Sequence, residues 1–367
     1  MKKIALISAN NYQNPYIIYP IGITYIATYL NEKMPDWQLG FFDFNLGGYE
    51  DLAAFCRNGN FDYIGVSLRN VDDTNFYEQY SFVSHYRRVM QVIRQNSRAV
   101  VIMGGSGFSI YPDVIFKELA PDYGVQGEGE ESMRQLVSAL EEKKDPTGID
   151  GLVYARPDGT VAINPHKQYI STLALNVEPD KAHFYFEKSG MLNIQTKRGC
   201  PYGCIYCSYP IIEGKSVRLL DARSVAENIK ELKNSKGIDY LFFTDSVFNI
   251  HKEYNRELCS LLIESKVNVK WGAYFTPHNM TYQDMELYKR SGLTHIEWGT
   301  DSLSDIQLEN YNKKFRFSDV KTQSLNAGKL GIYHAHFMIL AGYGETDETL
   351  NQTYERSREL GKTIFFP

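Results

Sequence analysis

Residues 197–207 read Lys-Arg-Gly-Cys-Pro-Tyr-Gly-Cys-Ile-Tyr-Cys, and this stretch decides the class of protein. It places Cys200, Cys204 and Cys207 on one short loop, with three residues inside the first gap and two inside the second. Three thiolates at this spacing can hold three irons of a [4Fe–4S] cluster and leave the fourth iron open for a small-molecule ligand. An iron that both transfers an electron and binds a substrate is catalytic, so the loop predicts a redox enzyme.

Two simpler interpretations of these cysteines fit the sequence less well. A disulfide framework is disfavoured because the chain has only 5 Cys in 367 residues, and we expect no secretory signal at its start. A structural zinc site needs a fourth ligand, and no second Cys-x2-Cys or His-x3-His pair follows the loop. Cys56 and Cys259 are isolated, and we interpret them as buried apolar side chains.

Composition sets broad limits on function. The 39 basic and 44 acidic residues give a net charge of −5, which argues against a nucleic-acid-binding surface. The sequence contains no apolar run long enough for a transmembrane segment, and we expect a cytoplasmic protein. Tyr and Phe are frequent, at 27 and 20 residues, and most of these rings are expected in the core. An apolar substrate is the other explanation of the aromatic content.

The first part of the chain, residues 1–144, predicts a doubly wound parallel sheet of the Rossmann type. Short apolar segments alternate there with helical patterns, and strands are expected at 3–8, 38–43, 63–67, 99–105 and 122–127. Ligands of such sheets bind at the carboxyl ends of the strands. The candidate binding residues at those ends are Asn45, Ser67, Arg69, Gly104, Gly105, Gly127, Glu128 and Gly129. The glycines let a ligand approach the backbone, although strand-ending turns also use glycine.

A Pro- and Gly-spaced stretch, residues 145–190, predicts a linker with a small hairpin formed by 152–155 and 161–163. Residues 191–367 then predict six strand–helix repeats, which suit a partial (β/α)6 barrel of the TIM type. Polar groups and glycines follow several of these strands, and the candidates are Asp245, Ser246, Asp301, Ser302, Gly342 and Gly344. The alternative interpretation of Asp245 and Asp301 is that they are helix N-caps, and that of Glu345 is a local cap or ion-pair partner. The chain stops directly after the sixth strand, so it is either naturally short or truncated.

The cysteine loop and the strand ends resemble those of the radical S-adenosylmethionine (SAM) superfamily. The resemblance implies that the open iron binds the amino and carboxylate groups of SAM and that Tyr206 lies against the adenine. It implies that Asp245 and Ser246 lie near the SAM ammonium, and that Asp301 and Ser302 replace the usual ribose-contacting Glu segment. Gly342 and Gly344 belong to a Gly-x-x-Gly-Glu-Thr-like turn beside the adenine.

Residues 1 to about 140 resemble the cobalamin-binding domain that precedes many radical SAM domains. The pieces that carry the resemblance are 20–22, 61–67, 103–105 and 127–130. One position departs from the methionine-synthase type of that domain, because Asn45 stands where a His ligates cobalt. Asn is a poor cobalt ligand beside imidazole, so we expect no His of this stretch on the lower face of the cofactor.

The resemblance implies a cobalamin-dependent radical SAM enzyme. SAM is cleaved reductively to methionine and a 5′-deoxyadenosyl radical, and the expected outcome is methylation of an unactivated carbon. The implied cofactors are the [4Fe–4S] cluster, SAM and cobalamin. The implied partners are a small-molecule substrate, for which an apolar molecule is one expectation, and an external electron donor such as flavodoxin or ferredoxin. The alternatives are a non-methylating rearrangement or cyclisation, with or without cobalamin, and an Fe–S electron-transfer or sensing protein. Proteins of that last class normally use four cysteines.

Overall fold

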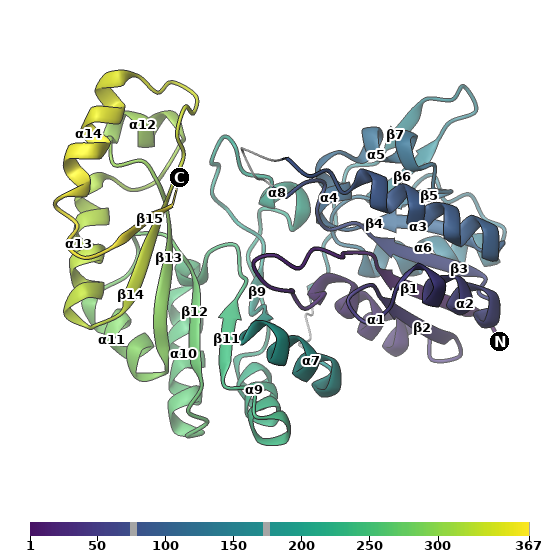
Figure 1. Cartoon of the computed structure of the whole chain (residues 1–367), viewed down its shortest axis with the longest axis horizontal. Coiled ribbons are helices and arrows are strands. Elements are labelled where there is room, and N and C mark those ends of the chain that lie inside the picture. The colour runs from purple at the N-terminus through teal and green to yellow at the C-terminus, as the bar shows by residue number, and fades with distance from the viewer. Residues whose placement is uncertain (74–78, 172–176, 367) are drawn as a thin grey trace. The chain divides into compact units, whose positions relative to one another are not determined.

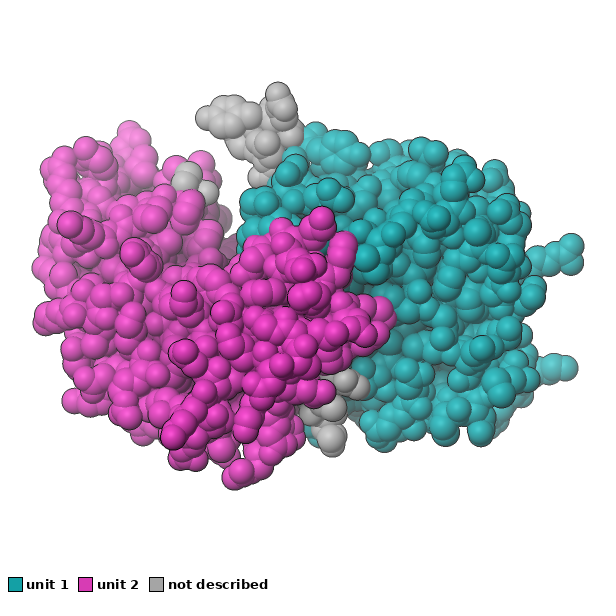
Figure 2. All heavy atoms as spheres, turned by 60° about the horizontal axis from the view of Figure 1, so that its bottom comes forward, with its two compact units in different colours: residues 1–171, 211–214 teal, residues 172–210, 215–367 magenta. Residues whose placement is uncertain are grey.

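The computed structural model describes residues 1–73, 79–171 and 177–366 and divides into two compact units. Unit 1 contains residues 1–171 and 211–214, and unit 2 contains residues 172–210 and 215–367 (Figure 2). Among the described residues, no helix has the length and apolar character needed to cross a membrane. Each unit is described separately below.

Unit 1 is built on a seven-stranded sheet in the order β2-β1-β3-β4-β5-β6-β7 (Figure 1). The first five strands pair in parallel, as the alternation of apolar segments and helical patterns predicts. Their bounds are β1 Lys3–Ser8, β2 Gln38–Asp43, β3 Tyr63–Ser67, β4 Val100–Gly104 and β5 Tyr123–Val125. The prediction of a doubly wound parallel sheet is confirmed for this unit.

Helices cover both faces of the sheet of unit 1. On one face α1 (Ile21–Lys33) and α6 (Glu130–Glu141) bury Leu30 and Leu136 against the strands. The other face is covered by α2 Tyr49–Gly59, α3 Val83–Asn96, α4 Ser106–Ile110 and α5 Pro112–Leu119. Two apolar cores, one for each face, hold the strands and therefore fix where their carboxyl ends lie.

The predicted hairpin forms, but it is part of unit 1 rather than of a linker. β6 (Leu152–Ala155) pairs antiparallel with β5 and with β7 (Val161–Ile163). Leu152 and Val153 are fully buried in the cores of the unit, which explains why the hairpin extends the sheet. The expected boundary after residue 144 therefore differs from the division of the structure, which follows residue 171.

Unit 2 contains the six-stranded parallel sheet of the partial barrel, in the order β15-β14-β13-β12-β11-β8 (Figure 1). The strands are β8 Leu192–Ile194, β11 Tyr240–Phe243, β12 Lys270–Phe275, β13 Leu293–Asp301, β14 Tyr333–Met338 and β15 Ile364–Phe366. Neighbouring strands follow one another along the chain, apart from a short antiparallel ribbon of β9 (Lys197–Arg198) and β10 (Arg218–Leu219). The predicted architecture is confirmed.

Helices pack on one face of this sheet, here called the outer face. They are α7 Pro179–Ser189, α9 Ala222–Lys236, α10 Lys252–Glu264, α11 Tyr282–Arg290, α12 Asp305–Asn310, α13 Phe317–Lys329 and α14 Asp347–Ser357, with the 3-10 turn η1 at Phe248–Ile250. The short helix α8 (Tyr209–Ile212) follows the cysteine loop along the chain, and its residues 211 and 212 are assigned to unit 1. On this face the fully buried Trp271 contacts Phe248 and Tyr288, and His336 lies beside Ser324 of α13. The opposite face of the strands is called the inner face.

Candidate active site

The cysteine loop begins where the first strand of the partial barrel ends. Residues 197 and 198 form β9, which pairs with β10, so the loop between them leaves and returns at one antiparallel ribbon. Gly199 has φ +88°, a left-handed conformation that glycine adopts without strain, and it turns the chain into Cys200. The carboxyl edge of the sheet thus presents the three cysteines, as active sites of such barrels require.

The three thiols lie on the same short loop but differ in how far they are buried. Cys200 is buried, whereas Cys204 and Cys207 are half-buried, and the Cys207 N–H donates to the Cys204 carbonyl at 3.2 Å. Burial raises the pKa of the Cys207 thiol, and the neighbouring Cys204 and Cys200 raise it further. Three soft thiolates on one short loop are the donor set of an iron–sulfur cluster.

No group of three or more His, Cys, Asp or Glu side chains converges on one point, as ligands of a single metal ion would, in the described parts of the chain. Thiolates that hold a [4Fe–4S] cluster each bond a different iron, so they surround a larger object than one ion. The three cysteines of the loop stay the predicted ligands of the cluster.

Lys197 and Asp245 form an ion pair in the interior of unit 2, beneath the cysteine loop. The Lys197 Nζ lies 2.5 Å from the Asp245 Oδ2, and the two side chains are 1% and 0% exposed. Asp245 also accepts from the backbone N–H groups of Thr196 and Lys197 and from the Thr196 hydroxyl. Burial lowers the pKa of Lys197, and the Asp245 charge opposes this effect. Asp245 is not an N-cap here; its two oxygens fix the strand end that leads into the loop.

Three further hydrogen bonds hold the cysteine loop in place. The Ser246 hydroxyl, at the end of β11, donates to the Gly199 carbonyl at 3.2 Å. The Asn312 side chain donates to the Gly203 carbonyl at 2.7 Å, and the Ile205 N–H donates to the Tyr311 carbonyl at 3.4 Å. The loop is therefore tied to the end of β11 and to the connection between α12 and α13, which restricts how the thiols can move.

Tyr206 and Asp301, predicted as neighbours of the adenine and the ribose, lie together. The Tyr206 hydroxyl donates to the Asp301 Oδ2, which also forms an ion pair with the Lys313 ammonium. Lys313 donates in addition to the Gly299 carbonyl at 3.2 Å and lies 5.4 Å from the centre of the Tyr206 ring. Asp301 has φ +65°, a conformation in which a non-glycine residue is strained, at the point where the pairing of β13 with β14 shifts register.

The remaining strand-end candidates of unit 2 pack within the protein. The Ser302 hydroxyl, fully buried, lies 3.1 Å from the Thr353 hydroxyl of α14. A side chain at Gly342 would clash with the Tyr311 hydroxyl, and one at Gly344 would clash with the Asn310 side chain. The Tyr311 ring in turn contacts the Tyr206 ring edge-on, with centroids 5.8 Å apart. The Gly342 turn is thereby connected to the aromatic ring beside the last cysteine. Glu345 pairs locally, accepting from the Ala341 N–H at 2.5 Å.

The candidate cobalamin residues of unit 1 gather at the carboxyl edge of its sheet. Ser8 pairs in register with Asp43 and with Ser67, and Ser67 pairs with Gly104, so these strand ends are neighbours. Asn45 follows Asp43, and its side chain donates to the Asn10 carbonyl at 3.4 Å. The other candidates follow the ends of β3, β4 and β5: Arg69, Gly105, Gly127, Glu128 and Gly129.

The same edge holds polar atoms without partners. The side-chain oxygens of Asn10 and Asn11 are buried and accept no hydrogen bond from any described residue. Because an unsatisfied buried acceptor is costly, such atoms indicate a place where a polar ligand binds. Cobalamin carries amide groups that can donate to these oxygens, so the edge fits that cofactor.

The glycines and the nearest histidine have clear packing roles. A side chain at Gly105, whose φ is +103°, would meet the Leu68 carbonyl oxygen at 2.4 Å, and one at Gly107 would meet the Arg69 carbonyl oxygen at 2.8 Å. Contact between two loops therefore explains both glycines without a ligand. His85, buried on α3, has Nε2 2.7 Å from the Ala9 carbonyl and Nδ1 2.6 Å from the Tyr49 hydroxyl. Both of its ring nitrogens are occupied by protein groups.

Sequence reasoning missed several residues that build the site. Lys197 and Lys313 are the two buried or nearly buried ammonium groups around the cysteine loop, and Asn312 and Tyr311 hold the loop from the α12–α13 connection. Lys197 directly precedes the Arg-Gly-Cys motif, which is the one local signal for it in the sequence. The other three have no distinctive spacing.

Two family models match the chain in the order expected from its motifs. A B12 binding domain matches residues 11–137, and the radical SAM superfamily model matches residues 194–356, which includes the cysteine loop. The chain therefore contains a radical SAM domain, with a B12 binding domain ahead of it. The two domains imply the three cofactors that the motifs predict: a [4Fe–4S] cluster, SAM and cobalamin.

Individual relatives are similar over most of this chain. The anaerobic magnesium-protoporphyrin IX monomethyl ester cyclase of Rubrivivax gelatinosus is 27% identical over 74% of the chain, and the match spans 51% of the cyclase. The tryptophan 2-C-methyltransferase of Streptomyces laurentii is 23% identical over 98% of the chain and 71% of the enzyme. The chain thus spans about half the length of the cyclase that it matches.

Solved structures share the fold of both units. The radical SAM methyltransferase TsrM of Kitasatospora setae, bound to tryptophan and a SAM analogue, has a TM-score of 0.87 at 22% identity and covers 100% of this chain and 72% of its own. The cobalamin-dependent radical enzyme OxsB has a TM-score of 0.82 at 17% identity and covers 99% of this chain and 53% of its own.

Proposed function

We propose that this chain is a cobalamin-dependent radical SAM enzyme that methylates an unactivated carbon of a small molecule. The observation that carries the proposal is the cysteine loop at the carboxyl edge of the partial barrel, in a chain that also has a B12 binding domain. Methyltransferases among the relatives support the methylation reaction. A cytoplasmic flavodoxin or ferredoxin is the proposed electron donor, and the aromatic content favours a largely apolar substrate.

The residues of unit 2 have distinct parts in this proposal. Cys200, Cys204 and Cys207 hold the cluster, which when bound supplies the electron for reductive cleavage of SAM. Tyr206 and Asp301 position the adenosyl part of SAM, and Lys313 holds the Asp301 carboxylate in place. Ser246, next to the first turn of the loop, keeps the Gly199 carbonyl oriented.

In unit 1, the carboxyl edge of the sheet is the proposed cobalamin site. Asn45, Ser67, Arg69, Gly104, Gly105, Gly127, Glu128 and Gly129 line it, together with the unpartnered oxygens of Asn10 and Asn11. Cobalamin supplies a methyl carrier when bound. The residues of this edge bind its polar side groups and exclude water from its surface.

Ring formation without methylation is the second candidate, because the cyclase of Rubrivivax gelatinosus is 27% identical over 74% of this chain. The two candidates use the same cluster and SAM sites, so these residues do not separate them. They differ in the fate of the methyl group of SAM, which only methylation transfers to the substrate.

The test begins with the chain purified anaerobically, reconstituted with iron and sulfide, and supplied with cobalamin, SAM and a strong reductant. 5′-Deoxyadenosine and S-adenosylhomocysteine are measured by mass spectrometry, and retained corrin is measured by its absorbance. Tryptophan and magnesium-protoporphyrin IX monomethyl ester are the first substrates to try, since relatives act on them by name. Cys204→Ala is the inactive variant and Cys56→Ala, in unit 1, is the matched control.

Formation of 5′-deoxyadenosine that Cys204→Ala abolishes, with corrin retained, supports the cobalamin-dependent enzyme. A methylated product with S-adenosylhomocysteine supports methylation, and a cyclised product without it supports the second candidate. Absence of both the cluster and 5′-deoxyadenosine contradicts the radical SAM proposal. A cluster whose EPR signal SAM does not change would favour an electron-transfer or sensing protein.

A further inference from the structure

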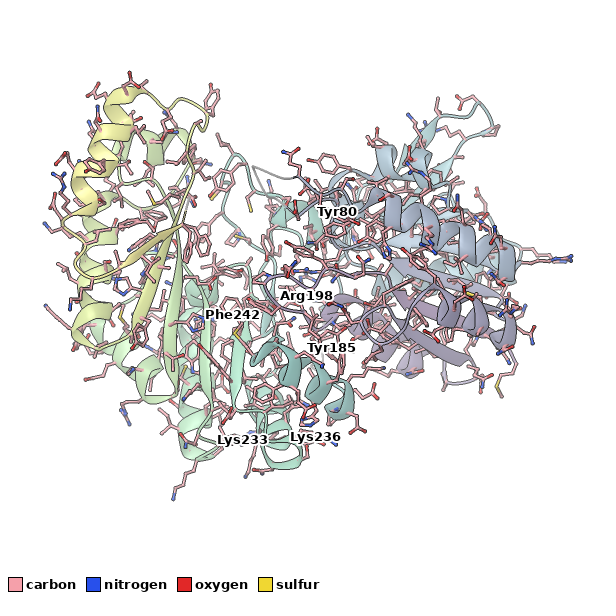
Figure 3. The ribbon with its side chains drawn as sticks, viewed as in Figure 1. Tyr80, Tyr185, Arg198, Lys233, Lys236 and Phe242 are labelled. Atoms are coloured by element: carbon pink, nitrogen blue, oxygen red, sulfur yellow. The ribbon has the colours of Figure 1, made fainter. Side chains whose placement is uncertain are left out.

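The inner face of the sheet in unit 2 carries a group of titratable side chains that the cluster and SAM sites do not use. Along β13, Trp298 points to the outer face, where its ring stacks with His336 and contacts Phe275. Side chains alternate along a strand, so His295 and Glu297 point to the inner face. Tyr240 and Phe242 of β11 meet His295 there, and Figure 3 labels Phe242.

His295 reaches across an entire strand because Gly272 leaves room for its ring. Phe242, Gly272 and His295 are in register on β11, β12 and β13. A Cβ at Gly272 would lie 1.9 Å from the His295 ring, so only glycine fits beneath it. The ring stacks on Phe242 with centroids 5.7 Å apart, and its Nδ1 lies 2.8 Å from the Tyr240 hydroxyl.

This arrangement directs the second nitrogen of the His295 ring at Glu297. The His295 Nε2 lies 4.0 Å from the Glu297 Oε1, and burial lowers the pKa of His295, which keeps the ring neutral. A neutral imidazole has one N–H. If Nδ1 accepts from Tyr240, the proton is on Nε2 and faces the carboxylate. His295 is thereby held beside Glu297, with its second nitrogen 4.0 Å from the carboxylate and beyond direct hydrogen-bond distance.

The Glu297 carboxylate itself is three-quarters buried, with a side chain 25% exposed, and it accepts no hydrogen bond from any side chain or backbone group in the described ranges. Burial raises the pKa of Glu297 to about 7. Keeping an ionisable group in such a position is costly unless a ligand uses it.

Exposed aromatic rings lie on the same face of the sheet, on the strands to either side of β13. Tyr274 is in register with Glu297 on the neighbouring strand and is 37% exposed. On the other side, Phe337 of β14 and Phe366 of β15 stack with centroids 5.4 Å apart, and both are partly exposed. Rings left open to solvent beside one carboxylate suit a flat apolar molecule with a hydrogen-bond donor.

We propose that Glu297, supported by His295, binds a donor group of the substrate on the inner face of unit 2, and that the substrate is a flat apolar molecule bearing an ammonium or N–H group. The aromatic rings of Tyr274, Phe337 and Phe366 contact the apolar part. The proposal rests on the proposed function only in that the ligand is the substrate of that enzyme. It assigns to Glu297 a part in substrate selection, separate from SAM cleavage.

The test uses two probes with the same ring and opposite charge, tryptamine and indole-3-propionate. Their binding to the full chain is measured by isothermal titration calorimetry at pH 8, where Glu297 is ionised. Glu297→Gln removes the charge, Glu297→Asp keeps it, and Glu286→Gln removes an exposed carboxylate on α11 as the matched control. Circular dichroism verifies that each variant is folded.

We expect tryptamine to bind at least tenfold more tightly than indole-3-propionate, with this preference lost in Glu297→Gln and kept in Glu286→Gln. Glu297→Asp should keep part of the preference. Equal binding of the two probes, no binding of either, or unchanged tryptamine binding by Glu297→Gln overturns the proposal.

Measuring 5′-deoxyadenosine on the same wild-type preparation separates this inference from the proposed function. If 5′-deoxyadenosine forms but binding does not depend on Glu297, the inference fails and the enzyme assignment stands. If tryptamine binding depends on Glu297 but no 5′-deoxyadenosine forms, the inference stands and the proposed enzyme function fails.

Discussion

The Nζ of Lys197 lies 2.5 Å from the Oδ2 of Asp245, and neither side chain is accessible to solvent. The pair joins the residue before the Arg-Gly-Cys motif to the end of β11, and the Lys197 ammonium also lies 4.5 Å from the centre of the Phe248 ring. A charged group so enclosed is tolerated only because the opposite charge and the surrounding hydrogen bonds replace water. The cysteine loop is thus mounted on an internal ion pair.

Replacing Lys197 by Met leaves the Asp245 charge buried without its partner. We expect this variant to lose about 3–5 kcal/mol of unfolding free energy, because removal of one member of a buried pair is strongly destabilising. Thermal unfolding followed by circular dichroism measures the effect. Lys233→Met is the control, since Lys233 pairs with Asp239 at the surface, where such a pair contributes less than about 1 kcal/mol. Equal losses in the two variants would contradict the importance of the internal pair.

Replacing Cys204 by Ala removes one of the three predicted cluster ligands. The wild-type chain should bind about four irons after anaerobic reconstitution, and Cys204→Ala should lose most of this iron and the visible absorbance. Cys56→Ala should keep both, because burial raises the pKa of the Cys56 thiol to about 11 and it lies in the core of unit 1. Iron and sulfide assays provide the measurement. Unchanged iron in Cys204→Ala would rule out this ligand set.

Lys313 is expected to act on SAM binding through Asp301. Lys313→Met leaves the Asp301 carboxylate without its ion-pair partner, which frees both Asp301 and Tyr206 to move. We expect the Kd for SAM to rise about tenfold, which corresponds to about 1.4 kcal/mol. Lys314→Met is the matched control, because Lys314 is exposed and contacts the Asn312 side chain instead. Calorimetric titration of the reconstituted protein with SAM measures the Kd of each variant. A similar rise in Kd in Lys313→Met and Lys314→Met would show that the ion pair of Lys313 with Asp301 does not determine SAM binding.

The buried carboxylate of Glu297 is expected to lower the free energy of unfolding of the chain at high pH, where it is ionised. Burial raises its pKa in the folded chain to about 7, from an ordinary value of 4.5, so the folded state binds more protons between these values. Stability contributed at this site therefore falls as pH rises through that window. Well above pH 7, Glu297→Gln should be more stable than the wild type by about 3 kcal/mol, and near pH 4 the two should be equal.

Denaturant titrations at pH 5, 7 and 8.5 measure this difference. The groups in the described residues that face Glu297 include His295 on its own strand and Tyr274 on β12. The control is Glu286→Gln on the surface of α11, whose stability should follow the wild type at every pH. A wild-type chain that is more stable than Glu297→Gln at pH 8.5 would contradict the expected sign.

Local sequence patterns were sufficient for the architecture and for the cysteine loop. The strand-like segments of both units are short and apolar and alternate with helical patterns, and strand pairing in parallel follows from that alternation. Cys200, Cys204 and Cys207 are close in the sequence, so their grouping needs no knowledge of the fold. The hairpin at residues 152–163 was recognised as a hairpin, but its partner strand, β5, was not, because edge pairing depends on which apolar face is available.

The rest of the candidate site depends on contacts between residues far apart in the sequence. Lys197 meets Asp245 across 48 residues, and Tyr206 meets Asp301 across 95. The sequence predicts Asp245 as a site residue from its position at a strand end. It does not predict that both Asp245 oxygens accept hydrogen bonds from Thr196 and Lys197, because those residues become neighbours of Asp245 only when β8 and β11 pair. For Gly105 the sequence predicts a place where a ligand approaches the backbone, and the nearby Leu68 carbonyl adds a packing reason for the same glycine that the sequence does not reveal.

The fit of the His295 ring over Gly272 has a consequence for reading other sequences of this superfamily. Any residue larger than glycine at position 272 (the first position) excludes an aromatic ring at position 295 (the second position). The two positions are therefore expected to change together during evolution. A relative with alanine at the first position should carry a small side chain at the second and should lack the support behind its equivalent of Glu297. Under our proposal for Glu297, the residue at the position of Gly272 on β12 is a marker, readable without any structure, for relatives that keep the same substrate site.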